Sequence, residues 1–129
     1  MRKISKLAAR AFINERKFSR DNTSVRSFPT IGGNMTELYL HGNIIARKRG
    51  DKIHLSLAGW PTMTTRERLN TLLYMLGSKM RFHQHEHEQY VWYIGRNNNT
   101  TRDWLPAQTI NARSWYLLEH TGLSELNPY

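Results

Sequence analysis

The segment GWPTMTTRERLN at residues 59–70 holds the side chains of this 129-residue chain that are best suited to chemistry. Two hydroxyls, at Thr64 and Thr65, and two cations, Arg66 and Arg68, lie where a helix is expected to begin. Together with the free backbone N–H groups of a helix N-terminus, they can bind a phosphate or a carboxylate. A simpler structural interpretation is favoured, in which a threonine caps the helix and the arginines pair with a carboxylate or with water.

A second candidate is the turn RKRGDK at residues 47–52, where four cations lie close together. Such a turn can lie beside a phosphate backbone or enter a groove as the tip of a β-ribbon. A charged turn also keeps any hairpin soluble. The pattern alone supports both interpretations equally.

Three histidines, His83, His85 and His87, recur with a period of two. In an extended strand they would share one face, and His-x-His pairs are zinc ligands. Three in a row span too far to converge without a bend, so the site needs a further ligand. That ligand would come from another histidine: His41, His54 or His120. A zinc-dependent hydrolase is therefore our third hypothesis, behind a polar strand with mild pH sensitivity.

Motifs typical of catalysis are otherwise missing from the sequence. There is no cysteine, no Gly-rich phosphate loop, no Gly-x-Ser-x-Gly elbow and no His-Glu-x-x-His helix. The ten acidic residues form no paired-carboxylate motif. The sequence thus favours a binding protein over an enzyme and names no catalytic residue and no required cofactor.

The net charge of +9 is distributed unevenly. Residues 1–26 hold eight basic and two acidic residues, whereas the rest of the chain holds eleven basic and eight acidic residues. Clustered cations raise the affinity for polyanions and the rate of association with them. We therefore predict contacts to phosphate from these residues: Lys3, Lys6, Arg10, Arg16, Lys17, Arg47, Lys48, Arg49, Arg66 and Arg68.

The elements that would position these side chains begin with a helix. Ser5 is its expected N-cap, and apolar residues follow at helical spacing to about Asn14, so we assign residues 1–18 to a basic N-terminal helix. The Ser-, Thr-, Asn- and Gly-rich stretch from Ser19 to Thr36 predicts an irregular connection with one short strand at residues 24–28.

Residues 36–77 predict a β-meander followed by an amphipathic helix. Apolar residues alternate around Leu38 and again from Ile53 to Leu57, with a tight turn at Gly42-Asn43 or, alternatively, a bent continuous strand there. Thr64 or Thr65 is the expected helix N-cap, with Thr64 and Glu67 forming a capping box. Leucines follow at helical spacing, and Gly77 is placed to end the helix.

Residues 80–129 predict a second β region and a C-terminal element of undetermined type. Aromatic and β-branched residues favour a strand from Gln89 to Ile94, and Gly95 to Thr101 is expected to be an exposed loop. After Pro106, residues 110–118 fit a helix, and residues 114–118 fit a final strand equally well.

The expected fold is α+β: a small, mainly antiparallel sheet of about five strands, with the amphipathic helix on one face and the basic helix at its edge. The length fits one domain over residues 1–129. No apolar run approaches the roughly 18 residues that would span a bilayer, so we expect no membrane partner.

Three segments are distinctive in combination: Asn22-Thr23, Leu40-His41-Gly42, and Gly59 to Asn70 with the pattern Gly-Trp-x-Thr-x-Thr-Thr-x-x-Arg-Leu-Asn. In residues 5–23 and 38–73, which contain these segments and lie within a span of a little over half of the chain, the sequence resembles small accessory proteins encoded by tailed bacteriophages. The resemblance implies a phage protein made in the cytoplasm of a bacterial host. It implies no catalytic or binding residue.

These observations lead to a ranked set of functions. The first is a phage-encoded accessory protein that binds nucleic acid or a nucleoprotein. The alternative is an inhibitor or modulator of a host enzyme, whose basic surface binds an acidic host protein. The sequence leaves open the oligomeric state, the base preference and whether the protein is part of the virion.

Overall fold

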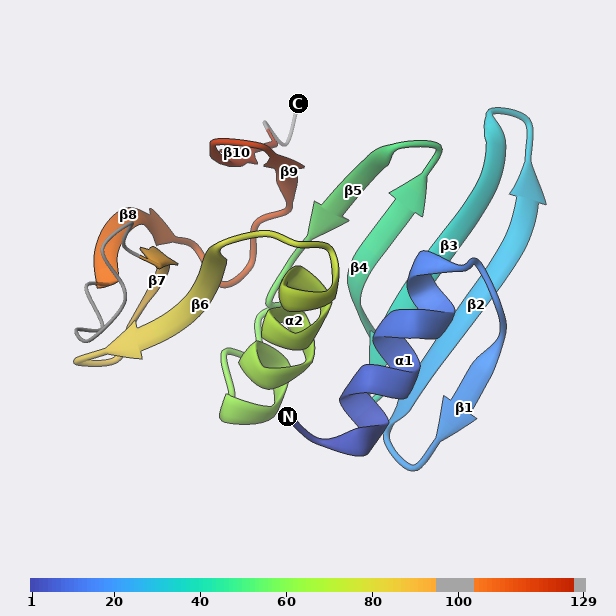
Figure 1. Cartoon of the computed structure of the whole chain (residues 1–129), viewed down its shortest axis with the longest axis horizontal. Helices are drawn as coiled ribbons and strands as arrows, with labels where there is room; N and C mark the ends of the chain where they lie inside the picture. The colour runs from blue at the N-terminus through green and yellow to red at the C-terminus, as the bar shows by residue number, and fades with distance from the viewer. Residues whose placement is uncertain (95–103, 127–129) are drawn as a thin grey trace.

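The computed structural model describes residues 1–94 and 104–126, so the loop predicted at Gly95 to Thr101 lies outside the described residues. Two helices and ten strands occupy this part of the chain (Figure 1). Their order is α1 (Lys3–Ile13), β1 (Phe18–Arg20), β2 (Thr23–Thr30), β3 (Gly33–Leu40), β4 (Asn43–Arg49), β5 (Lys52–Leu55), α2 (Met63–Met75), β6 (Met80–His85), β7 (Glu88–Ile94), β8 (Trp104–Ile110), β9 (Tyr116–Glu119) and β10 (Gly122–Glu125).

The strands form two antiparallel sheets, which confirms the α+β class but not the predicted strand number. One sheet has seven strands in the order β1-β2-β3-β4-β5-β9-β10, and the other has three in the order β6-β7-β8. The expectation of about five strands was therefore too low. It missed both edge strands of the larger sheet, β1 and β10, which have only three and four residues.

The short strand predicted at residues 24–28 is confirmed as part of β2, but the other residues of the stretch 19–36 do not form the predicted irregular connection. Instead they form β1 and the hairpin of β2 and β3, in register from Thr23 opposite Leu40 to Thr30 opposite Gly33. The Ser and Thr residues there resemble a loop in composition, but their small or β-branched side chains also suit a strand. Antiparallel pairing with β3 makes this segment a strand and not a loop.

The meander of β3, β4 and β5 is confirmed. Its first turn is His41-Gly42, one residue earlier than predicted, with φ angles of 51° and 80°. Two consecutive positive φ angles define the type I′ turn that matches the twist of a hairpin. The alternative of one bent strand is wrong, because β3 and β4 pair antiparallel.

Both helices lie on the same face of the seven-stranded sheet, in front of it in Figure 1. Alternation along the strands turns residues such as Val25, Leu38 and Leu55 toward the helices, where they are buried with Phe12 of α1 and Leu72 of α2. Helix α1 therefore packs against α2 over the sheet, rather than at the sheet edge as predicted.

The helix ends differ from their predicted capping. Helix α1 begins at Lys3 after Arg2, and Ser5 lies buried inside its first turn, so Ser5 is not the N-cap. Thr62 caps α2 by accepting a hydrogen bond from the Thr65 backbone N–H at 3.2 Å, so the cap at Thr64 or Thr65 and the Thr64–Glu67 capping box are both wrong.

The prediction for the end of α2 is confirmed. Gly77 has a φ of 79°, the Gly77 N–H donates to the Tyr74 carbonyl, and the Ser78 N–H donates to the Leu73 carbonyl. This pair of hydrogen bonds is a Schellman motif, which needs a residue with positive φ at the glycine position.

The second sheet follows α2 directly. The Asn70 side chain donates to the Phe82 carbonyl at 2.9 Å and accepts from the Phe82 N–H at 2.6 Å, so it pairs with β6 as a neighbouring strand would. The strand predicted at residues 89–94 is confirmed as β7. After β8 the chain returns to the main sheet as strand β9, so the helix alternative at residues 110–118 is wrong. Within the described residues, no helix combines the length and the apolar character needed to cross a bilayer.

Candidate nucleic-acid interface

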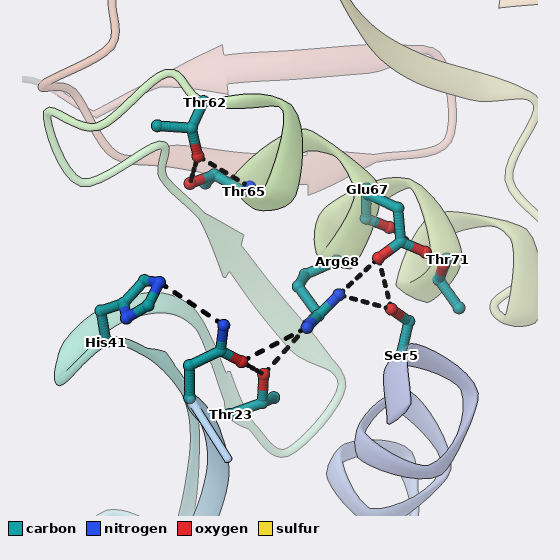
Figure 2. A network of polar contacts seen from close by, with 9 residues as sticks. Ser5, Thr23, His41, Thr62, Thr65, Glu67, Arg68 and Thr71 are labelled. Carbon is teal, nitrogen blue, oxygen red and sulfur yellow. Dashed lines mark hydrogen bonds and ion pairs between the residues drawn. The ribbon is translucent and has the colours of Figure 1, made fainter. Parts of the chain in front are cut away.

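The three segments that carry the resemblance to phage proteins meet around Arg68 (Figure 2). Its Nε donates to Thr23 Oγ1 at 3.0 Å, and its two NH groups donate to Ser5 Oγ, Glu67 Oε1 and Asn22 Oδ1 at 2.8, 2.6 and 3.3 Å. The guanidinium thus joins α1, α2 and the turn between β1 and β2. This arrangement is a structural crosslink between the two helices and the sheet.

Burial decides the role of Arg68. The residue is only 2% exposed, and a buried charge is tolerated only when it is paired and hydrogen-bonded. Burial tends to raise the pKa of the partner Glu67, but hydrogen bonds from Ser5, Thr71 and Arg68 outweigh it and leave that pKa below its usual value. Glu67 is therefore ionised at neutral pH. Arg68 has no donor facing solvent, so its predicted role as a phosphate contact does not fit the structure.

Arg66 is also engaged within the protein. One of its NH groups donates to the Pro61 carbonyl at 2.7 Å and to the side-chain oxygens of Gln84 and Gln89 at 3.1 Å each. These bonds hold the start of α2 against the second sheet. With Thr62 as the cap, the helix entrance is used for folding, which supports its structural interpretation over an anion site.

The predicted basic turn is divided by strand geometry. Lys48 points to the helix side, where its Nζ donates to the Ile13 carbonyl at 2.8 Å at the end of α1. Arg47 and Arg49 flank it on β4 and point to the other face. Of the three cations on β4, Arg47 and Arg49 therefore remain as candidates for a shared binding surface, and Lys52, the fourth cation of the turn, lies directly opposite Arg49.

The cations of α1 form a separate group. Lys3, Lys6 and Arg10 are exposed at helical spacing on the helix layer, and Arg16 and Lys17 follow in the exposed link to β1. Helix α1, which carries the first three of them, lies on the other side of the sheet from the face that Arg47 and Arg49 occupy. The structure thus separates the predicted contacts instead of joining them.

We call the side of the seven-stranded sheet that faces away from both helices the open face. Cross-strand register places two adjacent rows on it, one through Arg26, Glu37, Arg47 and His54 and one through Phe28, Met35, Arg49 and Lys52. Directly opposed residues in antiparallel strands share a face. One of these eight residues, Glu37, is a carboxylate. Five have cationic or imidazole side chains: Arg26, Arg47, Arg49, Lys52 and His54.

A pocket of about 620 Å³ opens on this face between β5 and the segment before β9. The pocket is lined by apolar and aromatic side chains, by cations and by one serine: Met35, His54, Trp115 and Leu126, then Arg47, Arg49, Lys52 and Arg113, and Ser114. The Arg47 guanidinium lies over the Trp115 ring, 4.8 Å from its centroid, which is a cation–π contact. Cations and an aromatic ring therefore meet in one concave site.

Glu37 fixes part of this site. It is 8% exposed, accepts a hydrogen bond from Arg47 Nε at 3.2 Å, and accepts another from the Tyr39 hydroxyl at 2.7 Å. Burial, and then the nearby Glu37 carboxylate, raises the pKa of Tyr39. Burial, and then the cations Lys52 and Arg47, lowers the pKa of His54. His54 is therefore neutral at pH 7, and the positive charge of the pocket belongs to Arg and Lys.

Several of these residues were not predicted as nucleic-acid contacts: Lys52 was named only as part of the basic turn, and His54 only as a possible zinc ligand. Lys52 and His54 alternate with buried Ile53 and Leu55, so a signal for their shared face was present. Arg26 lies in the short strand predicted at residues 24–28 but was not predicted as a contact. Arg113 and Trp115 come from sequence that fitted two structures equally well, and no local signal brings them to β5.

The three histidines are placed differently from their predicted strand. His83 and His85 belong to β6, but His87 lies in the turn between β6 and β7 with a φ of 68°. His83 packs against Trp92 with ring centroids 4.6 Å apart. Within residues 1–94 and 104–126 no group of three His, Cys, Asp or Glu side chains is arranged to hold a metal ion. The zinc site stays a prediction without geometric support.

Comparison with protein families identifies the class of the protein. The chain matches a family of phage proteins over residues 1–111. It belongs to the Kyanoviridae Gp96 protein family. Comparisons with curated proteins and with solved structures gave no match. The expected phage origin is thus confirmed, and the family description assigns no activity.

Proposed function

We propose that this phage protein binds nucleic acid through the open face of its seven-stranded sheet and acts as an accessory protein in the cytoplasm of the infected cell. The main observation in support of the proposal is that cations and aromatic rings lie close together on that face, at and around the Trp115 pocket. Lysine and arginine bind phosphates, and aromatic rings stack on bases. The chain's net charge of +9 adds long-range attraction for a polyanion.

Three exposed cations of the open face are the expected phosphate contacts: Arg26, Arg49 and Lys52. Each projects from a different strand, so their charges are held at spacings fixed by the sheet. Arg47 is held by Glu37 and Trp115, which gives it a fixed position in the pocket. Helix α1 lies on the other side of the sheet, so its exposed cations are expected to add only non-specific attraction.

Fluorescence-anisotropy titrations with single-stranded DNA, duplex DNA and RNA of equal length, each between about 50 and 200 mM salt, test the proposal. Replacing Arg26, Arg49 and Lys52 by Gln together should weaken binding at least about tenfold. It should also reduce the slope of log affinity against log salt by about two to three, because each of the three lost phosphate contacts contributes about 0.7 to 0.9 to that slope.

The matched control replaces Lys3, Lys6 and Arg10 by Gln, which removes the same charge from the surface of α1. Equal losses for the two variants would show that only the total charge matters, and would refute an interface on the open face. Absence of binding to all three ligands would refute nucleic-acid binding itself. A partner retained from nuclease-treated bacterial lysate would then support an acidic host protein as the ligand of this face.

A further inference from the structure

We infer that the pocket beside Trp115 receives one unpaired nucleobase, so that the open face binds single-stranded nucleic acid in preference to duplex. The inference rests on the proposed function and specifies its ligand. Its basis is the lining of the pocket, which combines apolar and aromatic side chains with cations.

The walls fit a planar, weakly polar group better than a phosphate. The Trp115 indole, the His54 imidazole and the Met35 thioether are surfaces on which a base can stack. The low pKa of His54, caused first by burial, keeps this ring uncharged at neutral pH. The volume of about 620 Å³ falls within the range of roughly 300 to 1,000 Å³ that is typical of ligand pockets.

The cations of the pocket fit the phosphates that flank such a base. Arg49, Lys52 and Arg113 belong to three different segments around it. Arg49 also lies against the turn between β2 and β3, with its NH1 atom 3.3 Å from the point where a Cβ of Gly32 would be. A glycine at this position leaves room for the guanidinium, so the arginine is positioned by the backbone of the neighbouring hairpin.

The wall is ordered before any ligand binds. Glu37 fixes Arg47 at 3.2 Å, and Arg47 in turn lies over the Trp115 ring. The Leu126 N–H donates to the Trp115 carbonyl at 2.8 Å, which holds the segment from the other side. A preordered wall lowers the entropic cost of binding. A base within a duplex is stacked on both faces and paired at its edge, so it cannot enter this pocket without being extruded.

The first test varies the ligand, so it does not depend on any variant folding. Anisotropy titrations compare an oligothymidylate, a duplex of the same length and an oligonucleotide of the same length with abasic sites, all at one salt concentration. The abasic strand keeps the phosphates and removes the bases. We expect the oligothymidylate to bind about tenfold more tightly than either competitor, as expected for loss of base stacking.

The second test changes the protein. Trp115→Ala should weaken oligothymidylate binding about tenfold, with the salt slope and the abasic-strand affinity unchanged. Trp115→Phe should restore much of the loss. Trp60→Ala is the matched control, because Trp60 is 62% exposed and lies outside the pocket.

The outcomes separate this inference from the proposed function. Equal affinity for oligothymidylate, abasic strand and duplex, with steep salt dependence, would overturn the base pocket and leave phosphate binding in place. The same holds if Trp115→Ala and Trp60→Ala behave alike. Absence of binding to every ligand would overturn both.

Discussion

Replacing Arg68 by Ala should destabilise the protein strongly without acting through nucleic-acid contacts. The change leaves the partly buried Glu67 carboxylate without its cation and removes hydrogen bonds to Ser5, Asn22 and Thr23. Breaking a buried charge network by removing one partner costs about 3 to 5 kcal/mol. Because the Glu67 side chain is 26% exposed, water recovers part of that cost, and we expect about 3 kcal/mol.

This loss is a large share of the roughly 5 to 15 kcal/mol that stabilises a typical domain. At about 4 °C per kcal/mol for a chain of this size, it corresponds to a fall in Tm of about 12 °C. Calorimetry and urea unfolding measure it, with Arg10→Ala on the exposed surface of α1 as the control. A variant with unchanged Tm but weakened nucleic-acid binding would refute the structural role of Arg68 and restore it as a phosphate contact.

Three further predictions concern stability. Asn70→Ala should cost about 1 to 3 kcal/mol in urea unfolding, because both backbone groups of Phe82 lose their partner, and a loss below about 0.5 kcal/mol would contradict the clamp between α2 and β6. Thr62→Ala should cost about 1 kcal/mol, whereas Thr64→Ala should cost less, and the reverse order would place the cap of α2 at Thr64. His54 has a pKa below its ordinary value of 6.5, so the unfolded chain takes up its proton first, and stability should fall as pH drops below about 6.5. His54→Gln should remove that part of the pH dependence between about pH 7.5 and 5.5, and an unchanged profile would argue against it.

Periodicity in the sequence predicted the elements that build their own core. The meander, α2 and β7 all have recognisable apolar patterns. Gly77 follows the end of α2 as expected, because the Schellman motif there needs a residue in the left-handed conformation. The full length of the β2–β3 hairpin was not predicted, because its polar residues are held in a strand by pairing with each other across the hairpin and not by an apolar pattern.

The candidate site was predictable only in part. Arg47, Lys48 and Arg49 were all predicted as contacts. Successive side chains of a strand point to opposite faces, so Lys48 points away from the face of Arg47 and Arg49. The burial of Arg68 depends on Ser5, Asn22 and Thr23, which lie far away in the sequence and meet it only in the folded protein. Trp115 reaches the open face because β9 pairs with β5 across a gap of about sixty residues, which no local pattern specifies.

Mapping the bound surface by amide chemical shifts tests the central claim most directly. Titrating the isotopically labelled protein with a short single-stranded oligonucleotide should perturb amides of β2 to β5 and the Trp115 indole N–H, and leave the exposed residues of α1 unchanged. Perturbations confined to α1 or to the second sheet would contradict an interface on the open face.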